Sequence, residues 1–141
     1  MKFFTVLVCL AGIGFLAGCG KDKRIGSSTL TGTWELRRTQ SMALTDYPAG
    51  NGNTYKFTST TYEKYSNGTL VKTGSYFVVK DFAVSQSIGL VVPAGQYNNR
   101  IIFDNDFISA KTFFEIEDNK LTMVSGFFPT DGGVWRIYEK Q

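Results

Sequence analysis

Few residues of this chain could carry covalent or proton-transfer chemistry. The 141 residues include no histidine and only two cysteines, Cys9 and Cys19. Histidine is the commonest general base and the commonest metal ligand, so its absence removes both uses together. No Gly-x-Ser-x-Gly stretch presents an ordered serine nucleophile, and no pair of acidic residues can be assigned acid and base roles. We therefore expect no enzyme, no catalytic residue, no cofactor and no metal site.

One acidic stretch has the spacing of a calcium-binding loop. Asp104 and Asp106 would supply the first ligands, and Glu115 would supply the last. Ile108 and Ser109 then fall at the two positions where such a loop needs an oxygen ligand and a glycine. We interpret the stretch as a solvated turn.

The surroundings of Cys19 predict a processing site. Lys2 is followed by an apolar run over residues 5–15 and by the small residues of Leu16-Ala17-Gly18-Cys19. A short charged start, an apolar segment and small residues at the cut describe a secretory signal. The apolar run is shorter than the roughly 20 residues that a membrane-spanning helix needs. We expect residues 1–18 to be removed.

The order Leu-Ala-Gly-Cys resembles the lipobox of bacterial lipoproteins. The resemblance implies cleavage before Cys19 and acylation of its sulfur with a fatty chain such as palmitate. It implies a protein anchored in the cell envelope, with the outer membrane as the expected location and the leaflet left open. Residues 19–29 would then be the lipidated cysteine and a flexible tether, because 20–29 shows no apolar periodicity.

Composition limits what the remaining domain, residues 30–141, can be. The formal net charge of the whole chain, +3, is too small and too evenly spread to indicate nucleic-acid binding. Cys9 would leave with the signal and Cys19 would carry lipid, so no thiol remains for a disulfide. The domain is long enough for one modest core, which must hold by packing alone.

From residue 30 onward the pattern is typical of short strands and turns. No stretch keeps apolar residues at i, i+3, i+4 and i+7 for two turns, so we expect no helix. β-branched and aromatic residues are frequent, and Gly, Asn and Asp recur at short intervals. Loops are expected over 41–52 and 126–133. Besides two hairpins, the expected strands are 33–40, 53–59, 76–80, 82–92, 100–104 and 134–140.

Two hairpins can be placed from their turns. Asn67-Gly68 suits a two-residue turn, since a type I′ turn needs positive φ at both positions. The second turn, at Asp118-Asn119, separates one apolar face from one charged face. The first turn predicts the pairs Ser66–Thr69, Tyr65–Leu70 and Glu63–Lys72, and the second predicts Glu117–Lys120, Ile116–Leu121, Glu115–Thr122 and Phe114–Met123.

Eight or nine strands without a covering helix favour an all-β fold. We predict an antiparallel up-and-down barrel of about eight strands, with a sandwich as the other way of removing the sheet edges. An eight-stranded barrel can be filled by side chains or can hold one small ligand. The chain contains 12 Phe, 7 Tyr and 2 Trp, so some aromatic side chains could line a cavity. The candidate ligand-binding residues are Tyr55, Phe57, Phe114, Ile116, Leu121, Met123, Phe127 and Phe128.

The pair Phe127-Phe128 stands apart from the other candidates. Adjacent residues of a strand point to opposite sides, so both rings cannot face one core. Either one ring lies near solvent as part of a binding site, or both fold back as a plug over one barrel end. The sequence leaves these alternatives open.

The first and last expected strands resemble the lipocalin pattern. Gly32-Thr33-Trp34 opens the first strand, and Trp135-Arg136 lies in the last. The whole arrangement resembles the lipocalin-like lipoproteins of Bacteroidetes. The resemblance implies structural roles for Gly32, Trp34 and Arg136, with the arginine packed across the Trp34 ring at one barrel end. It implies non-enzymatic binding of a small apolar or amphipathic molecule; the alternative is a module that contacts an envelope protein or polysaccharide.

Overall fold

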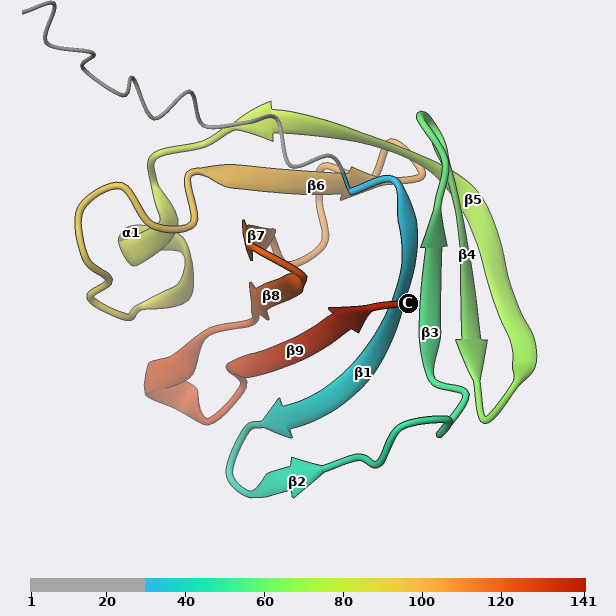
Figure 1. The fold of residues 1–141 in the computed structure, drawn as a ribbon. Coiled ribbons are helices and arrows are strands. Elements are labelled where there is room, and N and C mark those ends of the chain that lie inside the picture. Colours follow the sequence, from blue (N-terminus) through green and yellow to red (C-terminus); the bar gives the residue numbers. More distant parts are fainter. Residues whose placement is uncertain (1–29) are drawn as a thin grey trace, which may run out of the picture.

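An antiparallel sheet closes on itself to form the body of the molecule (Figure 1). The computed structural model describes residues 30–141, so the predicted signal, Cys19 and tether lie outside the described residues. The sheet contains nine strands, eight of which form a closed barrel. The predicted all-β barrel is therefore confirmed. The elements are β1 (Gly32–Gln40), β2 (Leu44–Asp46), β3 (Thr54–Phe57), β4 (Thr61–Ser66), β5 (Thr69–Lys80), α1 (Val84–Ile88), β6 (Asn99–Phe103), β7 (Thr112–Glu117), β8 (Lys120–Ser125), η1 (Phe128–Thr130) and β9 (Val134–Lys140).

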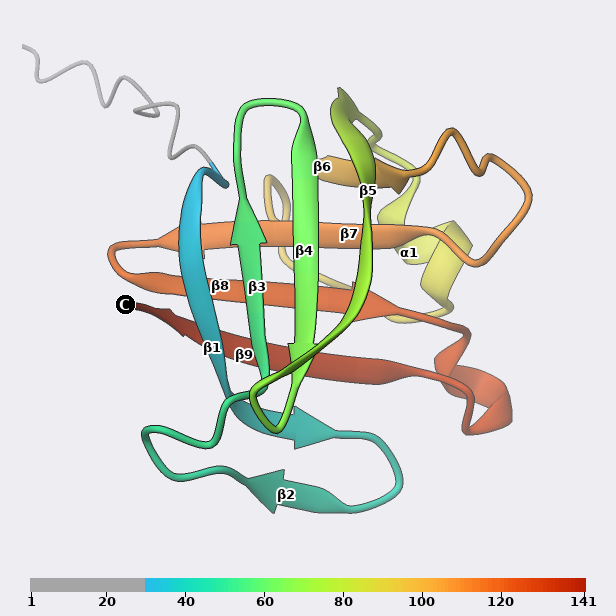
Figure 2. The same ribbon diagram turned by 90° about the vertical axis from the view of Figure 1, so that its right-hand side faces the viewer.

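The strands follow one another around the barrel in chain order, apart from the short β2. Pairing of β1 with β9 joins the two edges that an open sheet would leave free. Figure 2 shows two crossing layers: β1, β3 and β4 stand in front, and β7, β8 and β9 run across behind them. The long strand β5 belongs to both layers, because its first part pairs with β4 and its last part pairs with β6.

The strand β1 contains a β-bulge. Leu36 lies opposite Tyr138 of β9, whereas the next registered pair is Arg38 with Ile137, so Arg37 is the extra residue. A bulge bends its strand and increases the local twist, which helps β1 to serve both layers. The end of β1 also pairs with β2, where Arg38 Nε lies 2.6 Å from Asp46 Oδ1. The predicted loop over 41–52 therefore contains a short strand, β2.

The hairpin of β7 and β8 has the predicted register at all four pairs. Its inward side chains are buried: Phe114 is 5% exposed, Leu121 is fully buried and Met123 is 3% exposed. The opposite face carries Glu115 and Glu117. Separation of apolar from charged side chains selects this register, because a slip by one residue would bury the carboxylates.

The hairpin of β4 and β5 keeps the predicted turn but not the whole predicted register. Tyr65 pairs with Leu70 as expected. A register shift between Lys64 and Tyr65 then places Lys64 opposite Lys72. The predicted Glu63–Lys72 pair is therefore wrong, since a bulge adds one residue on one side of the ladder.

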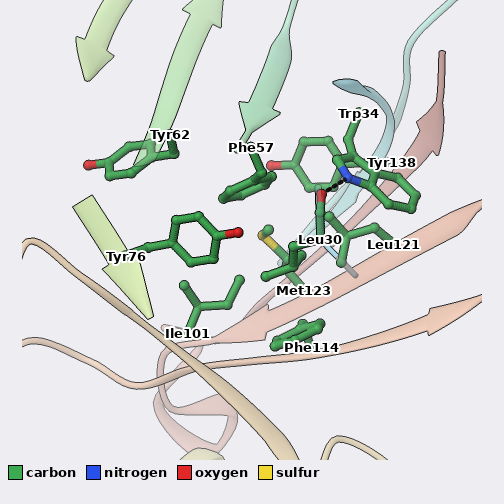
Figure 3. Close-up of a cluster of buried hydrophobic side chains, with 10 residues drawn as sticks. All are labelled: Leu30, Trp34, Phe57, Tyr62, Tyr76, Ile101, Phe114, Leu121, Met123 and Tyr138. Atoms are coloured by element: carbon green, nitrogen blue, oxygen red, sulfur yellow. Dashed lines mark hydrogen bonds between the residues drawn. The ribbon is translucent and has the colours of Figure 1, made fainter. Parts of the chain in front are cut away.

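The barrel interior is filled over most of its length by one cluster of buried side chains (Figure 3). Trp34 is 1% exposed, and its Nε1 donates a hydrogen bond to the Leu30 carbonyl at 2.6 Å. Removal of this apolar surface from water is the main stabilising contribution in a domain of this kind. The cluster consists of Leu30, Trp34, Phe57, Tyr62, Tyr76, Ile101, Phe114, Leu121, Met123 and Tyr138.

A second, smaller core lies on the outer face of β7 and β8, beneath α1. Val84 and Ile88 are four residues apart, so they lie on one face of the helix. They are buried together with Phe113 and Val124, which point away from the barrel interior. Figure 1 shows α1 outside the barrel, on the side where β6, β7 and β8 lie.

The predicted strand over 82–92 is therefore wrong. The Ala83 N–H donates to Asp81 Oδ1 at 3.0 Å at the start of the segment. Gly89 ends the helix with φ of 70°, a left-handed conformation that glycine adopts without strain. The five-residue helix is too short to show periodicity, and its burial against Phe113 and Val124 stabilises it.

Candidate ligand-binding site

A pocket of about 290 Å³ opens between the ends of β1, β3, β4 and β9. It continues the barrel interior where the core cluster stops. Its walls come from four strands and from the connection between β2 and β3. The lining residues are Leu36, Thr39, Tyr47, Asn53, Thr54, Tyr55, Lys64, Tyr65, Ser66, Arg136 and Tyr138.

The floor of the pocket is aromatic. The ring of Tyr55 meets the ring of Tyr138 edge to face, with 5.7 Å between centroids and 67° between planes. Tyr138 is 4% exposed and belongs to the core cluster, whereas Tyr55 packs against that cluster from the pocket side. Such a surface suits an apolar or aromatic group of a ligand.

Two cationic side chains line the same pocket. Arg136 is half-buried, and its Nη1 donates to Ser125 Oγ at 3.3 Å. Lys64 is more exposed, and its Nζ lies 5.6 Å from the centroid of the Tyr55 ring. Within residues 30–141, no carboxylate oxygen lies within 4.0 Å, the distance limit for an ion pair, of a side-chain nitrogen of Arg136 or Lys64. The pocket therefore has an uncompensated positive charge among the described residues.

The ionisable groups of the pocket respond to this arrangement. Burial lowers the pKa of Lys64, and the nearby positive charges of Arg136 and Lys72 lower it further. Burial raises the pKa of Tyr55 and of Tyr138, so both phenols keep their protons at neutral pH. Both tyrosines can consequently donate a hydrogen bond to an acceptor in the pocket.

No protein-family model, curated protein or solved structure matches this chain. Among the described residues, no group of three or more acidic, cysteine or histidine side chains could hold a metal ion. No helix of residues 30–141 is both long enough and apolar enough to cross a membrane.

A second pocket, of about 340 Å³, lies beside β5, β6 and the connection from β6 to β7. Its lysines are paired: Lys72 Nζ is 2.9 Å from Asp104 Oδ2, and Lys111 Nζ is 2.8 Å from Asp81 Oδ2. The predicted solvated turn lies here, with Asp106 accepting hydrogen bonds from the N–H groups of 108 and 109. Because its charges are compensated, we prefer the first pocket as the candidate site.

The predicted ligand-binding residues are mostly elsewhere. Tyr55 alone lines the candidate pocket. Phe57, Phe114, Leu121 and Met123 are core residues. Their packing fills the interior that the prediction had left available for a ligand. Ile116 is half-buried and packs against that cluster.

The adjacent phenylalanines lie outside the barrel. Phe127 is 44% exposed. Phe128 is half-buried against Trp135, with 5.1 Å between ring centroids, and joins the cluster beneath α1. The two rings therefore differ in environment, and Phe128 is part of the outer core rather than a plug of the barrel.

The structural role predicted for Arg136 is wrong. Trp34 pairs with Lys140, and the Lys140 Nζ lies 5.3 Å from the centroid of the indole ring. Arg136 pairs with Thr39, further along β1, and points into the pocket. The register of β1 with β9 thus separates the arginine from the tryptophan. Gly32, with φ of 131°, packs beside Lys140 at the opposite end of β1 from Thr39.

Sequence reasoning missed Lys64, Arg136 and Tyr138 as site residues. A usable signal was present in β9, because alternation places Arg136 and Tyr138 on one face. The partner strand then decides which face is inside. Tyr138 pairs with Leu121, a residue already predicted to point inward.

Proposed function

We propose that this protein is a lipid-anchored barrel of the bacterial cell envelope that binds a small amphipathic molecule and performs no catalysis. The observation that supports this best is the candidate pocket, with Tyr55 and Tyr138 at its floor and polar side chains at its mouth. Small-molecule sites are concave and combine apolar or aromatic surface with polar groups that fix the orientation of the ligand, and this pocket combines tyrosine rings with polar and cationic side chains.

The size of the pocket restricts the ligand. Known ligand pockets have volumes of about 300–1,000 Å³, and this one is at the lower end of that range at about 290 Å³. The core cluster blocks deeper entry, because Tyr62 and Phe57 are 2% and 3% exposed. The ligand should therefore be small.

The envelope location rests on the sequence at Cys19. Leu16-Ala17-Gly18-Cys19 resembles a lipobox, and the residues concerned lie outside the described structure. A single fatty chain holds a protein only marginally at a membrane, whereas two or more make the attachment stable. A permanently anchored barrel would meet its ligand in the water layer next to the membrane.

A second function, contact with an envelope protein or polysaccharide, is favoured by one exposed apolar site. The rings of Phe77 and Phe107 lie 5.9 Å apart on the outside of the barrel. Phe107 is 62% exposed, and the neighbouring Ile108 is 98% exposed. Photo-crosslinking from position 108 in intact cells would detect such a partner, with position 120 on the β7–β8 turn as the control.

Native mass spectrometry of protein purified from its own membrane tests the binding function. We expect a retained molecule that a Thr39→Trp variant loses, because Thr39 lines the pocket and an indole would fill it. Thr39→Val preserves the size of the side chain and should retain the molecule. Folded wild-type protein with no bound molecule, together with crosslinks from position 108, would favour the interaction function.

A further inference from the structure

The candidate pocket presents two cations above an aromatic floor. We propose that its ligand is a small organic acid whose carboxylate lies between Arg136 and Lys64. The apolar part of the ligand then packs on Tyr55. This inference rests on the proposed binding function and assigns the chemical class of the ligand.

Arg136 contributes the less exposed of the two charges. Its only hydrogen-bond acceptor among residues 30–141 is the Ser125 hydroxyl, at 3.3 Å. A guanidinium has five N–H donors, so most of its hydrogen-bonding capacity is available to a ligand. A carboxylate matches the planar fork of such donors in charge and in shape.

Lys64 contributes the second charge from the facing wall. It lies directly opposite Lys72 across β4 and β5, and like charges in that position destabilise a sheet. Lys72 is neutralised by Asp104, whose Oδ2 is 2.9 Å from its Nζ. Lys64 has no such partner within the described chain, so a bound anion would supply its missing counter-charge.

Tyr138 supplies an independent observation. The side chain is 4% exposed and lines the pocket, and no hydrogen bond joins its hydroxyl to another group in the part of the chain that the structure describes. The oxygen is not among the fully buried atoms without a partner, so it faces the open space of the pocket and can donate to a ligand there. A carboxylate oxygen is an acceptor of the required kind.

The size of the pocket sets the length of the acid. One water molecule occupies about 30 Å³ of liquid, so a pocket of about 290 Å³ accommodates about ten non-hydrogen atoms. Octanoate has this many, with one carboxylate and a short apolar chain. We therefore use it as the probe, with 1-octanol as its neutral equivalent and acetate as its charged end alone.

The experiment is a titration of the purified full chain with each probe, followed by the amide signals of Thr39, Asn53 and Ser66 in 1H–15N NMR spectra. We expect octanoate to bind about tenfold or more tightly than 1-octanol, with acetate much weaker than octanoate. Arg136→Gln should remove most of the preference for octanoate. Lys64→Gln should reduce it by less, since that side chain is more exposed.

Two further variants keep the result interpretable. Lys120→Gln removes an exposed cation at the β7–β8 turn and should leave all three affinities unchanged. Tyr138→Phe keeps the ring while removing the hydroxyl, and should weaken octanoate more than 1-octanol. If Arg136→Gln fails to fold, Lys64→Gln and Tyr138→Phe still decide the matter.

The outcomes separate this inference from the function on which it rests. Equal affinity for octanoate and 1-octanol, unaffected by the substitutions, would overturn the proposal that the ligand is an acid, while the pocket would remain a binding site. If acetate bound as tightly as octanoate, the proposal that the ligand is amphipathic would be overturned, because the apolar chain would contribute nothing to the affinity. Absence of binding by both octanoate and 1-octanol would overturn the binding function as well.

Discussion

The buried carboxylate of Glu35 is hydrogen-bonded by the guanidinium of Arg37, two residues further along β1. Both side chains lie on the outer face of the strand, where the connection before β3 covers them. Glu35 is 3% exposed, and it also accepts hydrogen bonds from the Gly50 and Gly52 N–H groups at 3.1 and 3.2 Å. Arg37 in turn donates to Glu139 of β9 at 3.0 Å. The pair therefore fixes the wall of the pocket that includes this connection.

Substitution of Glu35 by glutamine should destabilise the domain by about 1–3 kcal/mol, because it removes a buried charge that is paired with the half-buried Arg37. Chemical denaturation measures this change. Glu117→Gln, at an exposed position of the β7–β8 turn, should alter the free energy of unfolding by less than about 0.5 kcal/mol. Equal effects of the two substitutions would contradict the structural role of Glu35.

The same carboxylate should make stability depend on pH. Burial alone would raise the pKa of Glu35, but hydrogen bonds from Gly50, Gly52 and Arg37 outweigh it and hold the pKa below its ordinary value of 4.5. Folding therefore favours the ionised form. Its stabilisation is complete above pH 4.5 and is lost as the pH falls through the lower folded value.

The measurement is the free energy of unfolding from pH 7 down to pH 3 for the wild type and for Glu35→Gln. The difference in the free energy of unfolding between the two proteins should shrink on acidification, because a protonated Glu35 is neutral like glutamine. The other carboxylates are common to both proteins, so their effects cancel in the comparison. A difference that stays constant with pH would show that Glu35 does not titrate with folding.

Phe114→Ala should reduce the free energy of unfolding by about 3–5 kcal/mol, as expected for a large ring removed from a packed core. Phe114 is 5% exposed inside the barrel, whereas Phe82 is 75% exposed. Phe82→Ala is therefore the control, with an expected change below about 0.5 kcal/mol. A small effect at Phe114 would mean that the interior tolerates a cavity there.

The two adjacent phenylalanines should respond differently to serine. Phe128→Ser should cost about 2 kcal/mol, because the ring packs against Trp135 in the core beneath α1. Phe127→Ser should cost less than about 1 kcal/mol, since that ring is 44% exposed. Thermal unfolding of the two single variants tests this order, and the reverse order would contradict the packing described for η1.

Cys19→Ser should release the protein from the membrane without unfolding its domain, because the proposed lipid attaches to that sulfur. Fractionation after a high-salt wash, with detection of the protein in both fractions, provides the measurement. Cys9→Ser lies within the proposed signal and should leave the distribution unchanged. Persistence of the Cys19→Ser protein in the membrane fraction would contradict the lipoprotein proposal.

Local patterns were enough to predict much of the barrel. The β7–β8 hairpin could be registered because only one alignment puts Phe114 and Leu121 on one face and the charged residues on the other. The β4–β5 hairpin has two mixed faces, so its register shift between Lys64 and Tyr65 left no trace in the alternation. Register is predictable where a slip would be costly, and weakly specified elsewhere.

The pocket could not be predicted in the same way, because it depends on contacts between distant strands. Whether Arg136 lies near Trp34 or near Thr39 is decided by the closing pairs of β1 with β9. The short helix α1 also depends on contacts between segments that are distant in the sequence. Its burial depends on Phe113 and Val124, which come later in the chain.

The bulge at Arg37 determines which side chain faces Arg136. With the extra residue present, Thr39 is its partner; continuation of the Leu36–Tyr138 register without it would bring Arg38 to that place. Loss of the bulge without loss of a residue would thus exchange a small hydroxyl for a second guanidinium, and the faces of the rest of β1 would invert. One bulged residue in a strand of nine therefore sets both the free space and the charge of the pocket. Relatives that keep the residues of β1 but pair it with β9 without this bulge should differ in what they bind.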